Sequence, residues 1–310
     1  MENIRYDSGM EPTQNEHPYA RLTPDLILRA LESAGFVCDG RLLALNSYEN
    51  RVYQIGIEDS PPVIAKFYRP GRWSKQAILE EHAFSQELAA QEIPVIAPVT
   101  DEHGESLHEL EGFLFAAYPR CGGRWPDLDT KAQRQQMGRF LGRMHAIGAT
   151  RHFQHRNRLD IATLGDASRR FVLEEKLVPD YLFDAYATLS DDLLKQIRVM
   201  FEIAGSVAQI RLHGDCHKGN ILWTDRGPHI VDLDDSCSGP AIQDIWMLLS
   251  GETEEMRIQF EELLEGYQTF FEFDYSSVIL IEALRTLRML NYAAWLARRW
   301  QDPAFPIAFP

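Results

Sequence analysis

The sequence predicts an α+β protein of two lobes, a small β-rich lobe followed by a larger and mainly helical one. Strand patterns dominate the first part of the chain, helical periodicity dominates the second, and a glycine-containing break at residues 119–124 separates them. We therefore expect an N-terminal lobe over residues 21–118, a hinge or connector over 119–124, and a C-terminal lobe over 125–310. Residues 1–20 are polar and lack periodicity, which predicts a flexible tail.

The first lobe should open with a helix. Thr23 suits an N-cap, Pro24 suits the first helical position, apolar residues then recur at a helical period, and Gly35 ends the helix. After it, alternating apolar and polar residues bounded by turn signals predict strands. The expected strands cover residues 41–46, 51–57, 63–68 and 112–118, with a helix over 75–91 and an extended segment over 94–99.

The second lobe should be helical except for a strand-rich island at residues 209–235. Helices are expected at about residues 130–148, 178–207, 241–250, 254–273 and 276–300. Within the island, two short strands flank a turn at residues 225–228. An antiparallel hairpin about that turn would place Thr224 opposite His229 and Ile221 opposite Asp232, so that Asn220 lies beside Asp232.

The residues at the open end of this hairpin predict phosphoryl-transfer chemistry. One amide oxygen, from Asn220, and one carboxylate, from Asp232, suit Mg²⁺, which keeps waters and takes its other ligands from nucleotide phosphates. Asp215 lies five residues before Asn220, where it can accept the proton of an attacking hydroxyl as the catalytic base. The alternative is a surface hairpin with incidental acids, which the specific spacing disfavours.

A nucleotide site in the first lobe is predicted from Lys66. This lysine lies inside an apolar strand, where a charge is costly unless it is paired; an unpaired lysine on an edge strand is the alternative. The helix over 75–91 offers Glu80 and Glu81. Because Glu81 falls on the apolar stripe of that helix, we expect Glu81 to pair with Lys66.

The turn between the first two strands, residues 46–50, is the expected phosphate cover, although it contains no glycine. Ser47 and the amides of the turn could hold phosphate oxygens. An ordinary Asn- and Ser-rich hairpin turn explains the same residues equally well. Phe115 to Arg120 could form a hinge for the adenine, or Phe115 could be plain core.

The run His213-Gly214-Asp215, with Asn220 and then Asp232, resembles the signature of the aminoglycoside and choline kinase superfamily, whose members are relatives of protein kinases. The resemblance implies a protein-kinase-like fold, Asp215 as catalytic base, and Asn220 and Asp232 as Mg²⁺ ligands, which gives Asp232 a catalytic part as well. Gly214 stands where protein kinases have arginine, and Asp232-Leu233-Asp234 replaces their D-F-G triplet.

A closer resemblance covers nearly the whole chain. Residues Leu45–Tyr53, Lys66–Pro70, Leu141–His145 and Trp295–Trp300 are similar to the bacterial stress response kinase A (YihE/RdoA-like) family. This implies that Ser47 contacts ATP. It also implies a serine/threonine protein kinase that transfers the γ-phosphate of ATP to a protein hydroxyl in a bacterial stress response.

Composition and charge limit the other classes. A hydrophobic share of 45% is ordinary for a globular protein, and the net charge of −15 disfavours nucleic acid and anionic membranes as partners. The four cysteines are scattered without a C-x-x-C, so we expect neither a disulfide nor a cysteine metal site. No secretory signal is recognised, and a cytoplasmic monomer is expected.

ATP and a hydroxyl-bearing acceptor are the expected partners. A kinase acting on a choline-, aminoglycoside- or homoserine-like small molecule is the alternative to a protein kinase, because motif chemistry establishes only transfer to some hydroxyl. A non-catalytic pseudokinase scaffold is a third interpretation, which the joint presence of Lys66, Asp215, Asn220 and Asp232 disfavours.

Overall fold

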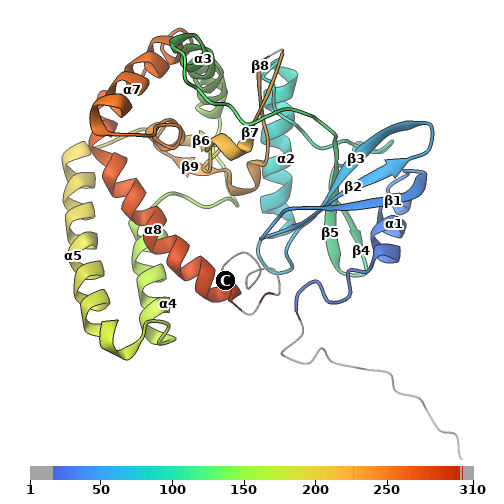
Figure 1. The fold of residues 1–310 in the computed structure, drawn as a ribbon, viewed down its shortest axis with the longest axis horizontal. Helices are drawn as coiled ribbons and strands as arrows, with labels where there is room; N and C mark the ends of the chain where they lie inside the picture. The colour runs from blue at the N-terminus through green and yellow to red at the C-terminus, as the bar shows by residue number, and fades with distance from the viewer. Residues whose placement is uncertain (1–16, 226, 301, 303–310) are drawn as a thin grey trace, which may run out of the picture.

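The computed structural model describes residues 17–225, 227–300 and 302, and it shows two lobes (Figure 1). A strand-rich first lobe and a mainly helical second lobe confirm the predicted α+β fold class. The first lobe comprises α1 (Pro24–Ser33), β1 (Cys38–Leu45), β2 (Arg51–Ile57), β3 (Ser60–Phe67), α2 (Lys75–Ala90), β4 (His108–Leu110) and β5 (Phe113–Pro119). No helix among these described residues, or in the described part of the second lobe, is long and apolar enough to cross a membrane.

The sheet of the first lobe has the strand order β1-β2-β3-β5-β4, with every neighbouring pair antiparallel. The α1 helix begins as predicted, because the Thr23 side chain accepts a hydrogen bond from the Leu26 amide at 3.3 Å. Its apolar stripe packs on the sheet, and Phe115 belongs to this core. Residues 1–16 of the predicted tail lie outside the described part, whereas Tyr19 is buried and donates to the carbonyl oxygen of Phe67.

The second lobe surrounds a small β-rich centre with helices. Its elements are α3 (Lys131–Gly148), η1 (Ala162–Ala167), α4 (Ser168–Glu174), α5 (Asp180–Ala204), β6 (Ile210–Leu212), η2 (Lys218–Asn220), β7 (Ile221–Thr224), β8 (Gly227–Ile230), η3 (Leu233–Asp235), β9 (Cys237–Gly239), α6 (Ile242–Trp246), α7 (Thr253–Tyr267), η4 (Tyr275–Ile279) and α8 (Leu280–Arg299). The helical segment η1–α4 was not predicted. Its Gly165 packs directly on Leu194 of α5 and Leu287 of α8, a tertiary contact that local periodicity does not display.

The predicted register of the β7–β8 hairpin was wrong. The structure pairs Thr224 with Gly227 and Ile221 with Ile230, so only two residues separate the strands instead of four. The strand resumes early because Gly227 takes a φ of 105°, a conformation that glycine adopts without strain. Asn220 consequently lies opposite Val231, whose amide donates to the Asn220 carbonyl at 3.0 Å, and Asp232 follows beyond the pairing.

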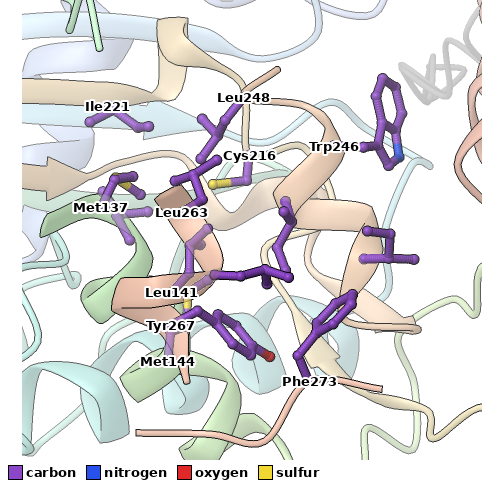
Figure 2. Packing of buried hydrophobic residues seen from close by; sticks show 14 of the residues in the cluster. Met137, Leu141, Met144, Cys216, Ile221, Trp246, Leu248, Leu263, Tyr267 and Phe273 are labelled. Carbon is purple, nitrogen blue, oxygen red and sulfur yellow. The ribbon is translucent and has the colours of Figure 1, made fainter. Parts of the chain in front are cut away.

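A large apolar core holds the second lobe together, and Figure 2 shows α3 and α7 contributing to it side by side. The two helices approach closely because glycines line the contact: a Cβ atom on Gly138 would overlap the carbonyl oxygen of Leu263, and one on Gly266 would overlap that of Gln135. Cys216, on the loop next to Asp215, is fully buried in the same core (Figure 2). This core therefore anchors the loop that carries the predicted base.

Replacing Gly138 with alanine should destabilise the protein. The new methyl group cannot enter the contact without moving α3 from α7, and such overpacking costs about 1–3 kcal/mol. Urea unfolding of Gly138→Ala and wild type measures this difference. Gly122→Ala is the control, because a Cβ atom there meets no atom within 4 Å; an equal stability of all three proteins would contradict the close contact.

Candidate active site

The loop that follows β6 carries His213, Gly214 and Asp215, and a buried carboxylate fixes its shape. Asp244, in α6, accepts hydrogen bonds from the amides of His213 and Gly214, each at 2.9 Å. Gly214 has a φ of 83°, and a Cβ atom there would overlap the carbonyl oxygen of Asp235. Glycine is therefore required where protein kinases carry arginine. These contacts show that Asp244 braces the loop.

His145 and Tyr267 hold Asp244 in turn. The His145 ring lies 3.1 Å from Asp244 Oδ2 through Nε2, and 2.9 Å from the Tyr267 hydroxyl through Nδ1. All three side chains are buried in the contact between α3, α6 and α7. His145 is thus a structural histidine that holds Asp244 in place.

Asp215 is a carboxylate with a different partner on each oxygen. Its Oδ1 lies 2.7 Å from Nη1 of Arg288, on α8, and its Oδ2 lies 3.4 Å from both His217 Nε2 and Asn220 Nδ2. Burial alone would raise the pKa of Asp215, but the hydrogen bond from His217 and the charge of Arg288 outweigh it and hold this pKa well below its usual range. Asp215 is therefore ionised and can accept a proton.

Asn220, which lies next to Asp215, and Asp232, which follows the hairpin, offer hard oxygen ligands. The Asn220 amide nitrogen donates to the Asp215 carbonyl oxygen at 3.0 Å, which leaves the amide oxygen to face elsewhere. The Asp232 side chain is 53% exposed, and its backbone is left-handed with a φ of 58°. No cluster of three or more His, Cys, Asp or Glu in the described residues could hold a metal by itself. This donor set fits Mg²⁺ that a nucleotide would help to ligate.

Lys66 is a buried cation at the contact between the lobes. Its ammonium group lies 2.9 Å from Asp232 Oδ1, 3.3 Å from Asp234 Oδ1 and 3.8 Å from Glu81 Oε1. Burial lowers the pKa of Lys66, but the charges of Asp232, Asp234 and Glu81 outweigh it and raise this pKa well above its usual range. The second lobe thus supplies two of the three carboxylates that balance this charge.

The two candidate glutamates of α2 face different neighbours. Glu81 is buried beside Lys66, whereas Glu80 accepts hydrogen bonds from the amides of residues 154–156, the closest at 2.6 Å. Burial raises the pKa of Glu81 to about 7, although the charge of Lys66 acts against it. Of the two glutamates, Glu81, on the apolar stripe of α2, is therefore the one beside Lys66, although Asp232 and Asp234 lie closer to the ammonium group.

Asp234 is a buried acid that the sequence did not single out as a site residue. It lies between the cations Lys66 and Arg72 and accepts a hydrogen bond from Asn50 Nδ2 at 3.1 Å. Burial would raise its pKa, but Arg72 and Lys66 hold this pKa well below its usual range. The only sequence signal was an acid two residues after Asp232. Its partners come from distant segments, so no local pattern could reveal it.

The turn at residues 46–50 lies between β1 and β2, and it contains Ser47. Two side chains from the end of α8 hold this turn through Glu49: Trp295 Nε1 donates to it at 2.6 Å and Arg299 Nη2 at 2.8 Å. Asn50 links the turn to Asp234. The helix that touches Asp215 therefore also reaches the expected phosphate cover.

A buried histidine, His82, contacts Tyr68, whose ring lies under the Lys66 ammonium group. His82, in α2, is buried between the Tyr68 hydroxyl at 2.7 Å and the Ser106 hydroxyl at 2.8 Å, and the Lys66 ammonium lies over the Tyr68 ring at 5.2 Å. Burial lowers the pKa of His82 to about 3, and the charge of Lys66 adds to the effect. His82 therefore stays uncharged in the folded protein.

The sequence matches the phosphotransferase enzyme family over residues 41–281. It is 46% identical over 292 residues to stress response kinase A of Escherichia coli O157:H7, covering 94% of this chain and 88% of that protein. It is 44% identical to the serine/threonine protein kinase RdoA of Salmonella typhimurium LT2, covering 96% of this chain and 89% of that one.

Solved structures agree on the fold. An amicoumacin kinase in complex with AMP-PNP, Ca²⁺ and Ami superposes with a TM-score of 0.68 at 20% identity, covering 87% of this chain and 85% of that chain. A microcompartment-associated aminopropanol kinase gives the same TM-score at 19% identity, covering 91% and 93%. At such identities the likeness concerns the fold alone, and it supports the two-lobed kinase-like architecture.

Removing the Asp244 carboxylate should cost both stability and activity. Asp244→Ala leaves the amides of His213 and Gly214 and the ring of His145 without their acceptor inside the core, which costs about 3–5 kcal/mol. Urea unfolding measures this loss. Asp25→Ala, at an exposed carboxylate of α1, is the control and should change little.

Acid should destabilise the protein through His82. The unfolded chain binds a proton at His82 below about pH 6.5, whereas the folded chain does so only near pH 3, so the free energy of unfolding falls as the pH falls through this window. Between pH 7.5 and 5.5 wild type should lose about 1.4 kcal/mol more than His82→Gln. Both proteins contain Glu81, so urea unfolding at the two pH values isolates His82; equal losses would contradict a neutral histidine.

Proposed function

Because this chain belongs to the phosphotransferase enzyme family and, within it, to the stress response kinase A family, we propose that it is a serine/threonine protein kinase acting in a bacterial stress response. In this proposal it transfers the γ-phosphate of ATP, with Mg²⁺, to a protein hydroxyl. The chemistry rests on one observation, that an ionised Asp215 lies beside Asn220 on the loop before the β7–β8 hairpin. Asp232, which follows the hairpin, contacts Lys66.

Asp215 would act as the base. Phosphoryl transfer passes through a loose transition state, so the carboxylate has to orient the attacking hydroxyl and accept its proton late in the reaction. A carboxylate whose pKa lies well below its usual range can serve such a late transfer, because it is always ionised when the acceptor arrives. The loop amides held by Asp244 fix the position of Asp215.

Asn220 and Asp232 would hold Mg²⁺, and Lys66 and Ser47 would contact the nucleotide phosphates. The metal, when bound, neutralises charge that develops on the transferred phosphoryl group. Lys66 is kept protonated by its carboxylate neighbours, and it can exchange contact with Asp232 for contact with a phosphate while Glu81 and Asp234 continue to hold it. Glu81 thereby acts as a positioning residue for Lys66.

A small-molecule acceptor is the second candidate. It is favoured by the fold, which the chain shares with an aminopropanol kinase and an amicoumacin kinase. Both candidates require the same base and the same nucleotide site, and they differ only in the hydroxyl that approaches Asp215. A non-catalytic scaffold is disfavoured because the carboxylates, the amide and the lysine needed for transfer occur together.

Incubation with Mg²⁺ and γ-labelled ATP, alone and with casein as a protein acceptor, tests the proposal. Wild type should label serine or threonine on itself or on casein. Asp215→Asn should reduce labelling by about 10²- to 10⁴-fold while ATP affinity is retained, because the base does not touch the nucleotide. Asp232→Ala should instead raise the Mg²⁺ concentration needed for half-maximal rate.

Each other result has a definite meaning. Label that appears only on small hydroxyl compounds would move the protein to the metabolite kinases. A near-normal rate in Asp215→Asn would refute the base, and an unchanged Mg²⁺ requirement in Asp232→Ala would refute its role as ligand.

A further inference from the structure

One face of α8 runs along the active site. Arg288, Tyr292, Trp295 and Arg299 recur at offsets of four, three and four residues, which places them on the same side of the helix. The stacked rings of Tyr292 and Trp295, whose centroids are 5.4 Å apart, lie between the two arginines in this row. Figure 1 shows the helix running from the end of α7 toward the first lobe.

The first residue of this row touches the proposed base. Nη1 of Arg288 lies 2.7 Å from Oδ1 of Asp215. The partners of the other carboxylate oxygen, His217 and Asn220, come from the same loop as Asp215 itself. Arg288 is thus the contact that ties the carboxylate to a helix outside the loop, and it holds one oxygen while the loop holds the other. The rotation of the carboxylate about its Cβ–Cγ bond is defined by this arrangement.

The α8 helix is itself fixed along its length, which a positioning role requires. Leu287 and Leu290, on either side of Arg288 in the sequence, are buried in a cluster with Leu194 and Ile197 of α5. At the far end, Trp295 and Arg299 hold Glu49 in the turn between β1 and β2. Arg288 therefore projects from a helix that both lobes hold in place.

We propose that Arg288 is a positioning residue for phosphoryl transfer, which orients the Asp215 carboxylate so that one oxygen faces the acceptor hydroxyl. The inference rests on the proposed function, because it assigns Asp215 as the base. The Arg288 side chain is 43% exposed, whereas the Asp215 side chain is 19% exposed, so the pair lies at the edge of the site and the arginine balances a partly buried carboxylate as well as orienting it. Because such a pair can also contribute to stability, the test of positioning uses kinetic measurements and a double-mutant cycle.

The matched variants are Arg288→Ala, Arg288→Lys and Arg298→Ala. The control Arg298 lies three turns along the same helix, where its guanidinium stacks over Phe171 of α4 at 4.4 Å, away from Asp215. Arg288→Ala should lower kcat about 10- to 100-fold with the KM for ATP unchanged. Arg288→Lys keeps a cation and should recover part of the loss. Arg298→Ala should keep the wild-type kcat.

A double-mutant cycle separates positioning from a general structural effect. If Arg288 acts through Asp215, then Arg288→Ala should change the residual rate of Asp215→Asn by less than about twofold, because the carboxylate that it orients is gone. The same fold loss in both backgrounds would overturn the inference. So would an unchanged kcat in Arg288→Ala, or an equal loss in Arg298→Ala.

The measurements distinguish this inference from the proposed function. If wild type phosphorylates only small hydroxyl compounds, the protein-kinase proposal fails, and the same cycle measured with that acceptor still tests Arg288. If wild type transfers phosphate but the Arg288 variants match it, the inference alone fails. A wild type without any ATP turnover would overturn both.

Discussion

The structure depends on one buried positive charge. Lys66 is only 6% exposed inside β3, and its own lobe offers it Glu81 as a carboxylate neighbour. The other two come from the second lobe, Asp232 and Asp234. Asp232 is 53% exposed, but Asp234 is buried, and removing a buried partner costs about 3–5 kcal/mol, so this charge balance favours the two lobes staying together. The sheet of the first lobe and the segment after the β7–β8 hairpin therefore meet at Lys66.

A second series of contacts connects the core of the second lobe to the loop that carries Asp215, the proposed base. Gly138 and Gly266 let α7 approach α3 closely, and this approach brings Tyr267 to His145. His145 in turn contacts Asp244, and Asp244 accepts hydrogen bonds from the amides of the two residues before Asp215. Each of these steps is buried, so the loop inherits the rigidity of the core and not the mobility of a surface segment. At the end of this series the Asp215 carboxylate contacts Arg288 of α8 through Oδ1.

The sequence predicted the parts of this site that follow local rules. The stripe position of Glu81 pointed to the lysine because helical period decides which of two adjacent glutamates faces the core. The hairpin register was missed because one glycine shortened a turn. Asp234 and Arg288 could not be predicted, since their partners lie far away in the chain and only the packing of whole helices brings them together. The functional roles of the site residues stay predictions: Ser47, Lys66, Glu81, Asp215, Asn220 and Asp232.

Because α8 is the last of the described elements in the chain, its contacts can form only late in synthesis. During synthesis the ribosome completes the β-sheet, the catalytic loop and Asp244 well before it makes Arg288, Trp295 and Arg299. At the usual rate of about 5–20 residues per second, several seconds pass before the nascent chain contains the α8 residues that contact Asp215 and Glu49. In our proposal, a partly made chain would already contain the residues that bind nucleotide, but its Asp215 carboxylate would not yet be oriented by Arg288. The order of translation would thus keep phosphate transfer slow until the helix that joins the lobes has been made.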